Sequence, residues 1–98
     1  MFVVIGILIG LAVGAALAQR GLGDAAIAFS LERDGIGPEW SASALAGLEP
    51  ERDRAVRLAA RRGATAKTAR WLAGRGFAAD SIEAALASVA KDERLELG

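Results

Sequence analysis

Two stretches of the chain, 41 residues apart, share one unusual pattern. Residues 31–46 read LERDGIGPEWSASALA, residues 72–87 read LAGRGFAADSIEAALA, and the two agree at five of 16 positions. In each stretch a helix-like segment is followed by a glycine, one large apolar residue and a second helix-like segment. Gly35 and Gly76 can supply the left-handed conformation that ends a helix, and Ile36 and Phe77 can then fill the angle between two helices. A period near 40 residues is typical of helical repeats.

The rest of the chain is also helical in character. Ala, Leu, Arg and Glu dominate after residue 18, and no run alternates apolar and polar residues as a half-buried strand would. Pro38 and Pro50 suit the first turns of helices, Asp80 with Glu83 has the pattern of an N-terminal cap, and Gly63 suits a helix end. We therefore predict helices over residues 24–34, 38–47, 50–62, 65–75 and 79–91.

These helices predict an all-α fold of tandem short repeats with right-angled corners, preceded by an apolar N-terminal helix. The predicted parts are residues 1–19 (the apolar helix), 20–62 (repeat one) and 63–98 (repeat two with an acidic tail). The corners are predicted to be formed by Gly35, Ile36, Leu72, Gly76 and Phe77, with Trp71 packing inward beside Leu72.

The composition argues against catalysis. The chain has no Cys, no His and no Tyr. This removes thiolate chemistry, the commonest general base and the usual zinc and iron ligands. Only Lys, Asp, Glu or Ser could carry a reaction. We expect a non-enzymatic protein without a cofactor or a metal site.

Zero net charge hides strong zoning. Residues 19–51 carry a local charge of −4, residues 52–75 carry +7 and residues 76–98 carry −3. A basic segment inside an acidic chain is a candidate contact surface for an anionic partner. Arginine dominates this segment, which favours bidentate recognition of carboxylate or phosphate. The candidate partner-binding residues are Arg54, Arg57, Arg61, Arg62, Lys67, Arg70 and Arg75. The alternative is an ordinary solvated helix face, in which arginine serves helix propensity.

The order of these residues resembles a known family. R-G-x-G at residues 20–23, the corner at Leu31, Gly35 and Ile36, and K-x-x-R-W-L-x-x-R-G-F at residues 67–77 are similar to the carboxyl-terminal two repeats of RecX, the bacterial regulator of RecA recombinase. The resemblance continues through Asp80, Ile82, Ala85 and Leu86 and covers about residues 20–90. The R-G-F segment is its most specific part.

The resemblance implies tandem three-helix units and a non-enzymatic role in recombination, DNA repair and the SOS response. The partner would be RecA or the RecA–DNA filament, with direct contact to DNA phosphate as a further expectation. The chain departs from the family in two places. An apolar run stands where the family's first repeat should lie, and Gly74 stands where the family often has a basic residue.

The apolar run, residues 2–18, has three open interpretations. It is long enough to span a bilayer at the lower limit, and Gly6, Gly10 and Gly14 form the G-x-x-x-G pattern of membrane helices that approach closely. With Arg20 on its carboxyl side, a span would tether the domain to the cytoplasmic face of the inner membrane. It could instead be a signal peptide ending near Ala18, or the atypical start of a fragment of a longer RecX-like protein.

The function therefore has one leading interpretation and two alternatives. The leading one is a cytoplasmic modulator of RecA. One alternative is a small membrane-anchored helical protein of unrelated role, and the other is a general nucleic-acid binder that uses the basic segment alone.

Overall fold

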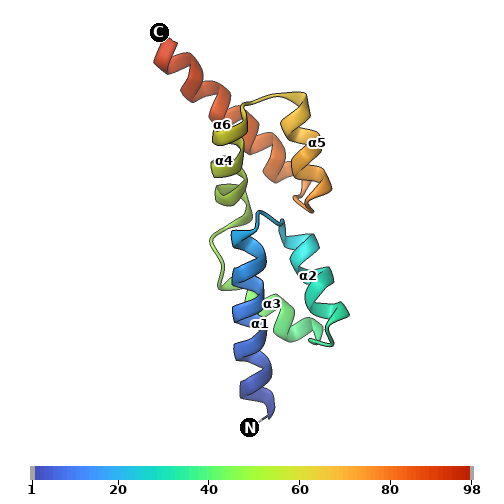
Figure 1. Ribbon diagram of the computed structural model, residues 1–98. Coiled ribbons are helices and arrows are strands. Elements are labelled where there is room, and N and C mark those ends of the chain that lie inside the picture. The colour runs from blue at the N-terminus through green and yellow to red at the C-terminus, as the bar shows by residue number, and fades with distance from the viewer. Residues whose placement is uncertain (1, 98) are drawn as a thin grey trace.

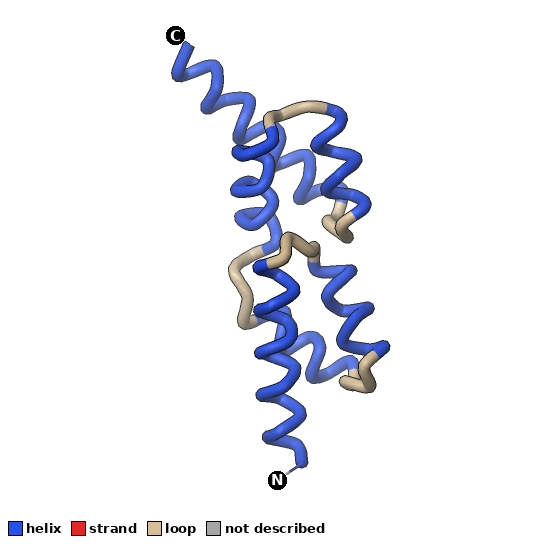
Figure 2. The backbone as a smooth tube through the Cα atoms, viewed as in Figure 1, coloured by secondary structure: helices blue, strands red, loops and turns tan. Residues whose placement is uncertain are grey.

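The protein is all-α throughout the part of the chain that the structure describes. The computed structural model describes residues 2–97, and the side chains of residues 8–95. Over these residues it has six helices and no strand (Figures 1 and 2). The helices are α1 (Phe2–Gln19), α2 (Asp24–Arg33), α3 (Pro38–Ala46), α4 (Glu51–Arg62), α5 (Ala66–Gly74) and α6 (Ala79–Leu97). The five helices predicted after residue 20 are confirmed, although α6 extends six residues beyond its predicted end at residue 91.

The six helices form two groups of three. Helices α1, α2 and α3 pack on one another at one end of the molecule, and α4, α5 and α6 do so at the other (Figure 1). The molecule measures 57 × 20 × 18 Å, and its radius of gyration of 15.2 Å exceeds the roughly 13 Å of a compact domain of this length. The packing thus groups α4 with α5 and α6, whereas the domain boundary predicted at residue 62 would separate them.

Each group has its own hydrophobic core. In the first, Ile27, Leu31 and Ala44 are fully buried or nearly so, and Val13 and Leu17 of α1 pack against them. The core of the second group is larger. It consists of Ala55, Ala59, Leu72, Phe77, Ile82, Ala85 and Val89.

Helices α2 and α5 end in the same way. Gly35 has φ of +86° and Gly76 has φ of +91°, as their positions predict. The Ile36 amide donates to the Leu31 carbonyl at 2.9 Å, and the Phe77 amide donates to the Leu72 carbonyl at 3.2 Å. These are the bonds of a Schellman motif, in which the residue after the left-handed glycine turns back over the last helical turn.

The two corners differ in burial. Leu72 is fully buried and Phe77 is 5% exposed, which confirms both as core residues. Ile36 is only half-buried, although it packs against the first core. The prediction of two buried corners is therefore confirmed at Phe77 and only partly met at Ile36.

The start of α6 corrects one sequence-based prediction. Asp80 lies inside the first turn of α6 rather than at its cap. The backbone amide of Ala78 and the hydroxyl of Ser81 instead donate to the carboxylate of Glu51, at 3.4 and 2.5 Å. A side chain from another helix, far away in the sequence, thus takes the role that we assigned to Asp80.

Two glycines of α1 lie inside the molecule. Gly10 and Gly14 are buried, and a Cβ atom at these positions would lie 3.8 Å from Ile36 and 3.7 Å from Ala44. The small residues therefore let α1 lie close to α3 and to the corner before it. The surroundings of Gly6 lie outside the described side chains.

The structure also bears on the predicted membrane span. Among the residues that it describes, no helix combines the length and the apolar character needed to cross a bilayer.

Candidate partner-binding surface

The two groups of helices meet through their backbones. The amide of Gly23, just before α2, donates to the carbonyl of Arg75, just after α5, at 2.8 Å. A Cβ atom on Gly23 would lie 2.4 Å from the carbonyl carbon of Gly76, and one on Gly76 would lie 2.5 Å from the Cβ of Ala26. Only glycine fits at Gly23 and Gly76 while the two turns stay in contact.

We call this contact between the turn before α2 and the turn after α5 the junction, and Arg75 adds side-chain hydrogen bonds to it. Its Nε donates to the carbonyl of Gly21 at 2.9 Å, and its guanidinium also donates to the carbonyl of Arg20. These carbonyls follow the last turn of α1, where the helix dipole favours a cation. The segments R-G-x-G and R-G-F, which carry the family resemblance, therefore contact each other.

Arg54 is the second arginine of the junction. It is 5% exposed. Its guanidinium donates to the carbonyls of Glu49 and Leu22, each at 3.0 Å, and forms an ion pair with Asp24. A buried arginine with carbonyl and carboxylate partners has its charge compensated inside the protein. Arg54 is therefore not available to a partner at the surface, and we remove it from the predicted contact residues.

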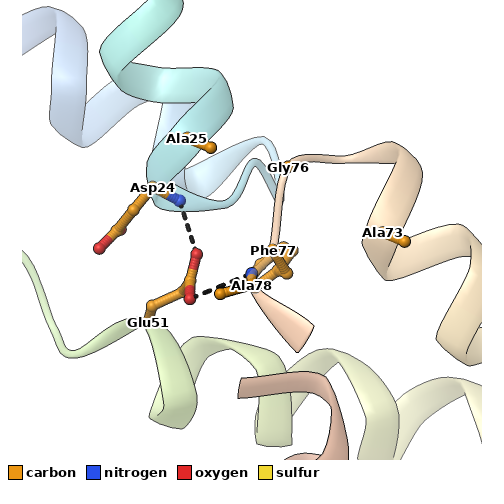
Figure 3. Close-up of a pocket in the computed structure, with 7 residues that line it drawn as sticks. All are labelled: Asp24, Ala25, Glu51, Ala73, Gly76, Phe77 and Ala78. Carbon is orange, nitrogen blue, oxygen red and sulfur yellow. Dashed lines mark hydrogen bonds between the residues drawn. The ribbon is translucent and has the colours of Figure 1, made fainter. Parts of the chain in front are cut away.

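Glu51 joins three helix starts at the same place (Figure 3). It is the first residue of α4, and one carboxylate oxygen accepts from the amide of Asp24, the first residue of α2, at 2.9 Å. The other oxygen accepts from Ala78 and Ser81 at the start of α6. A carboxylate is stabilised where helix N-termini converge, because unpaired amides and the helix dipoles both favour negative charge.

A cavity of about 540 Å³ lies beside Glu51. Its walls are short apolar side chains, one aromatic ring and two carboxylates (Figure 3). They belong to Asp24, Ala25, Glu51, Ala73, Gly76, Phe77 and Ala78. Because Glu51 already accepts hydrogen bonds from both helix starts, and Asp24 pairs with Arg54, this cavity is part of the junction.

The remaining cations of the basic segment are at the surface. Five of the predicted contact residues are exposed, on α4 and α5; we call them the basic surface. They are Arg57, Arg61, Arg62, Lys67 and Arg70. Within the described side chains, Arg57 is the member of this set that forms an ion pair, with Glu49. The junction fixes α4 against α2 and α6, and so holds the basic surface in place.

Trp71 is half-buried and lies close to two arginines. The guanidinium carbon of Arg62 lies 4.0 Å from the centre of the Trp71 ring, and that of Arg75 lies 5.2 Å away. Both distances are within the range of cation–π attraction. Trp71 also packs against the second core, so it links the basic surface to the interior.

The sequence placed all seven candidate cations in one segment, but the structure divides them. Arg54 lies in the junction, as does half-buried Arg75, and the other five lie outside it. Sequence reasoning missed the roles of Glu49 and Glu51. Glu51 lies in the first turn of α4, where an acid is favoured, but this local signal does not show that two other helices begin beside it.

Comparisons with known proteins add no relative to this description. No protein-family model, no curated protein and no solved structure matches the chain.

Proposed function

We propose that the chain is a non-enzymatic, RecX-like protein that binds the RecA–DNA filament and modulates recombination. The observation that carries this proposal is the exposure of five cations on consecutive helices, α4 and α5, in a chain with no net charge. Such a surface suits an anionic partner. RecA as the partner rests on the resemblance of residues 20–90 to RecX.

We further propose that α1–α3 and α4–α6 are two repeats of one three-helix unit. Two observations support this. The Schellman corners of α2 and α5 lie at the 41-residue offset of the sequence match, with equivalent hydrogen bonds at Ile36 and Phe77. Each unit also has its own hydrophobic core. In this proposal the apolar α1 is the first helix of the first repeat, and the chain acts in the cytoplasm, where RecA is found.

The junction supports a role in filament binding because it makes an extended shape rigid. A filament presents a long surface, and a molecule 57 Å long with two fixed units can contact it through both units. Rigid units lose less conformational entropy on binding than units joined by a flexible linker.

The test is the ATPase activity of RecA on single-stranded DNA, measured with increasing amounts of the chain. We expect a dose-dependent change in rate that is complete at a few-fold excess over RecA. A parallel strand-exchange assay should change over the same range. An unchanged ATPase rate and unchanged strand exchange at several-fold excess would contradict the proposal.

A further inference from the structure

We propose that a pocket between the end of α1 and the side of α4 is a binding site for one phosphate group. The pocket has a volume of about 170 Å³. One wall is the last turn of α1 and the residues after it, and the other wall is about two turns of α4. The lining residues are Ala18, Gln19, Gly21, Arg54, Arg57, Leu58 and Arg61.

The chemistry of the pocket is that of an anion site. Arg54, Arg57 and Arg61 lie at i, i+3 and i+7 on α4, so their side chains share one side of the helix. Arg54 at the base is committed to the junction. Arg57 and Arg61 are exposed, and their planar guanidinium groups match the geometry of phosphate oxygens. These two residues would hold the ligand.

Glu49 pairs with one of these two arginines in the free protein. Its carboxylate is paired with Arg57, and the two side chains are 40% and 56% exposed. An ion pair in water contributes little, so a phosphate can displace the carboxylate at small cost. Arg61 has no carboxylate partner among the described side chains. Glu49 is thus an internal competitor for the anion, and its removal should strengthen binding.

This site rests on the proposed function and makes it more specific: Arg57 and Arg61 of the basic surface would contact the DNA backbone. Arg57 and Arg61 line the pocket and are exposed, which suits one phosphodiester of a strand that passes across it. Free inorganic phosphate has the same chemistry, and the experiment separates the two sources.

The experiment measures the affinity of the full chain for a fluorescent single-stranded oligonucleotide, without RecA, by anisotropy at several salt concentrations. The variants are Arg61→Gln and Glu49→Gln, and the control is Arg52→Gln, which removes one exposed cation of α4 outside the pocket. We expect Arg61→Gln to weaken binding about tenfold, the usual effect of losing one charge-assisted contact. It should also reduce the slope of log affinity against log salt by about 0.7. Glu49→Gln should tighten binding several-fold, and Arg52→Gln should change it less than twofold.

Equal weakening by Arg61→Gln and Arg52→Gln, with no gain from Glu49→Gln, would overturn the site, because it would mean diffuse attraction. Titration with inorganic phosphate alone separates the sources. Binding of free phosphate as tight as that of the oligonucleotide would support the site with free phosphate as its ligand. The site and the proposed function can fail separately. Unchanged RecA activity would reject the proposed function but would not alter the affinities measured without RecA. Equal effects of Arg61→Gln and Arg52→Gln would reject the phosphate site but would not exclude filament binding.

Discussion

Gly23 and Gly76 lie in direct backbone contact across the junction between the two groups of helices. A Cβ atom added at Gly23 would lie 2.4 Å from both the carbonyl carbon and the carbonyl oxygen of Gly76. The hydrogen bond from the amide of Gly23 to the carbonyl of Arg75, at 2.8 Å, sits beside this contact. This backbone contact forms the junction together with Arg54, Arg75 and Glu51, and replacing Gly23 or Arg54 should therefore destabilise the protein.

Replacing Gly23 by Ala should destabilise the protein by at least about 2 kcal/mol, because the new methyl group meets rigid backbone and the two turns must separate. The control is Gly74→Ala, where the added Cβ has no atom within 4 Å and the glycine is in a helix. That variant should be unchanged or more stable by up to about 1 kcal/mol. Urea denaturation of the three proteins measures both effects. Equal stability of the parent and Gly23→Ala would show that the two turns are not in contact.

Arg54→Met should cost about 3–5 kcal/mol, since it leaves Asp24 without its buried partner and two carbonyls without a donor. The matched variant Arg57→Met removes the same charge from the same helix at an exposed position. It should cost less than about 1 kcal/mol, as exposed ion pairs do. Thermal unfolding followed by circular dichroism distinguishes the two. If both variants have the melting temperature of the parent, Arg54 does not stabilise the fold.

Phe77→Ala should destabilise the chain by about 3–5 kcal/mol, because a large buried side chain is lost from the second core. For a domain of this size such a loss is much of the total stability. Ile36→Ala at the equivalent corner should cost less, about 1–2 kcal/mol, since Ile36 is half-buried. Chemical denaturation shows which of the two variants loses more stability. A larger effect at Ile36 than at Phe77 would contradict the difference in burial.

The helices could be predicted from the sequence because their signals are local. Pro38 at the first position of α3 and the left-handed glycines Gly35, Gly63 and Gly76 all act within one turn of their own position. The end of α6 was missed because its apolar periodicity stops at Val89. Residues 91–97 nevertheless contain only good helix formers and Asp92, with no Pro or Gly to end the helix.

The junction could not be predicted because its interactions are not local. Glu51 bonds to the amide of Asp24 and the hydroxyl of Ser81, which are 27 and 30 residues away, and Arg75 bonds to the carbonyl of Gly21 across 54 residues. The sequence alone does not distinguish a buried arginine from an exposed one, because the hydrogen-bond partners that decide its burial are distant in the chain. Arg54 and Arg57 stand on neighbouring turns of α4, yet one is 6% exposed in its side chain and the other 56%.

Our proposal that the basic surface binds the RecA–DNA filament can be tested by measuring the affinity of the labelled chain for assembled filaments. The test variant is the triple replacement Arg57→Glu, Arg61→Glu and Arg70→Glu. The control has the same change in charge at three exposed cations outside the basic surface, Arg33→Glu, Lys91→Glu and Arg94→Glu. Helix content of all three proteins should agree by circular dichroism, because every replaced side chain is exposed. We expect the test variant to lose filament binding and the control to keep it within about threefold, since charges outside a contact change affinity little. Filament binding by the test variant at the affinity of the parent would show that the basic surface does not bind the filament.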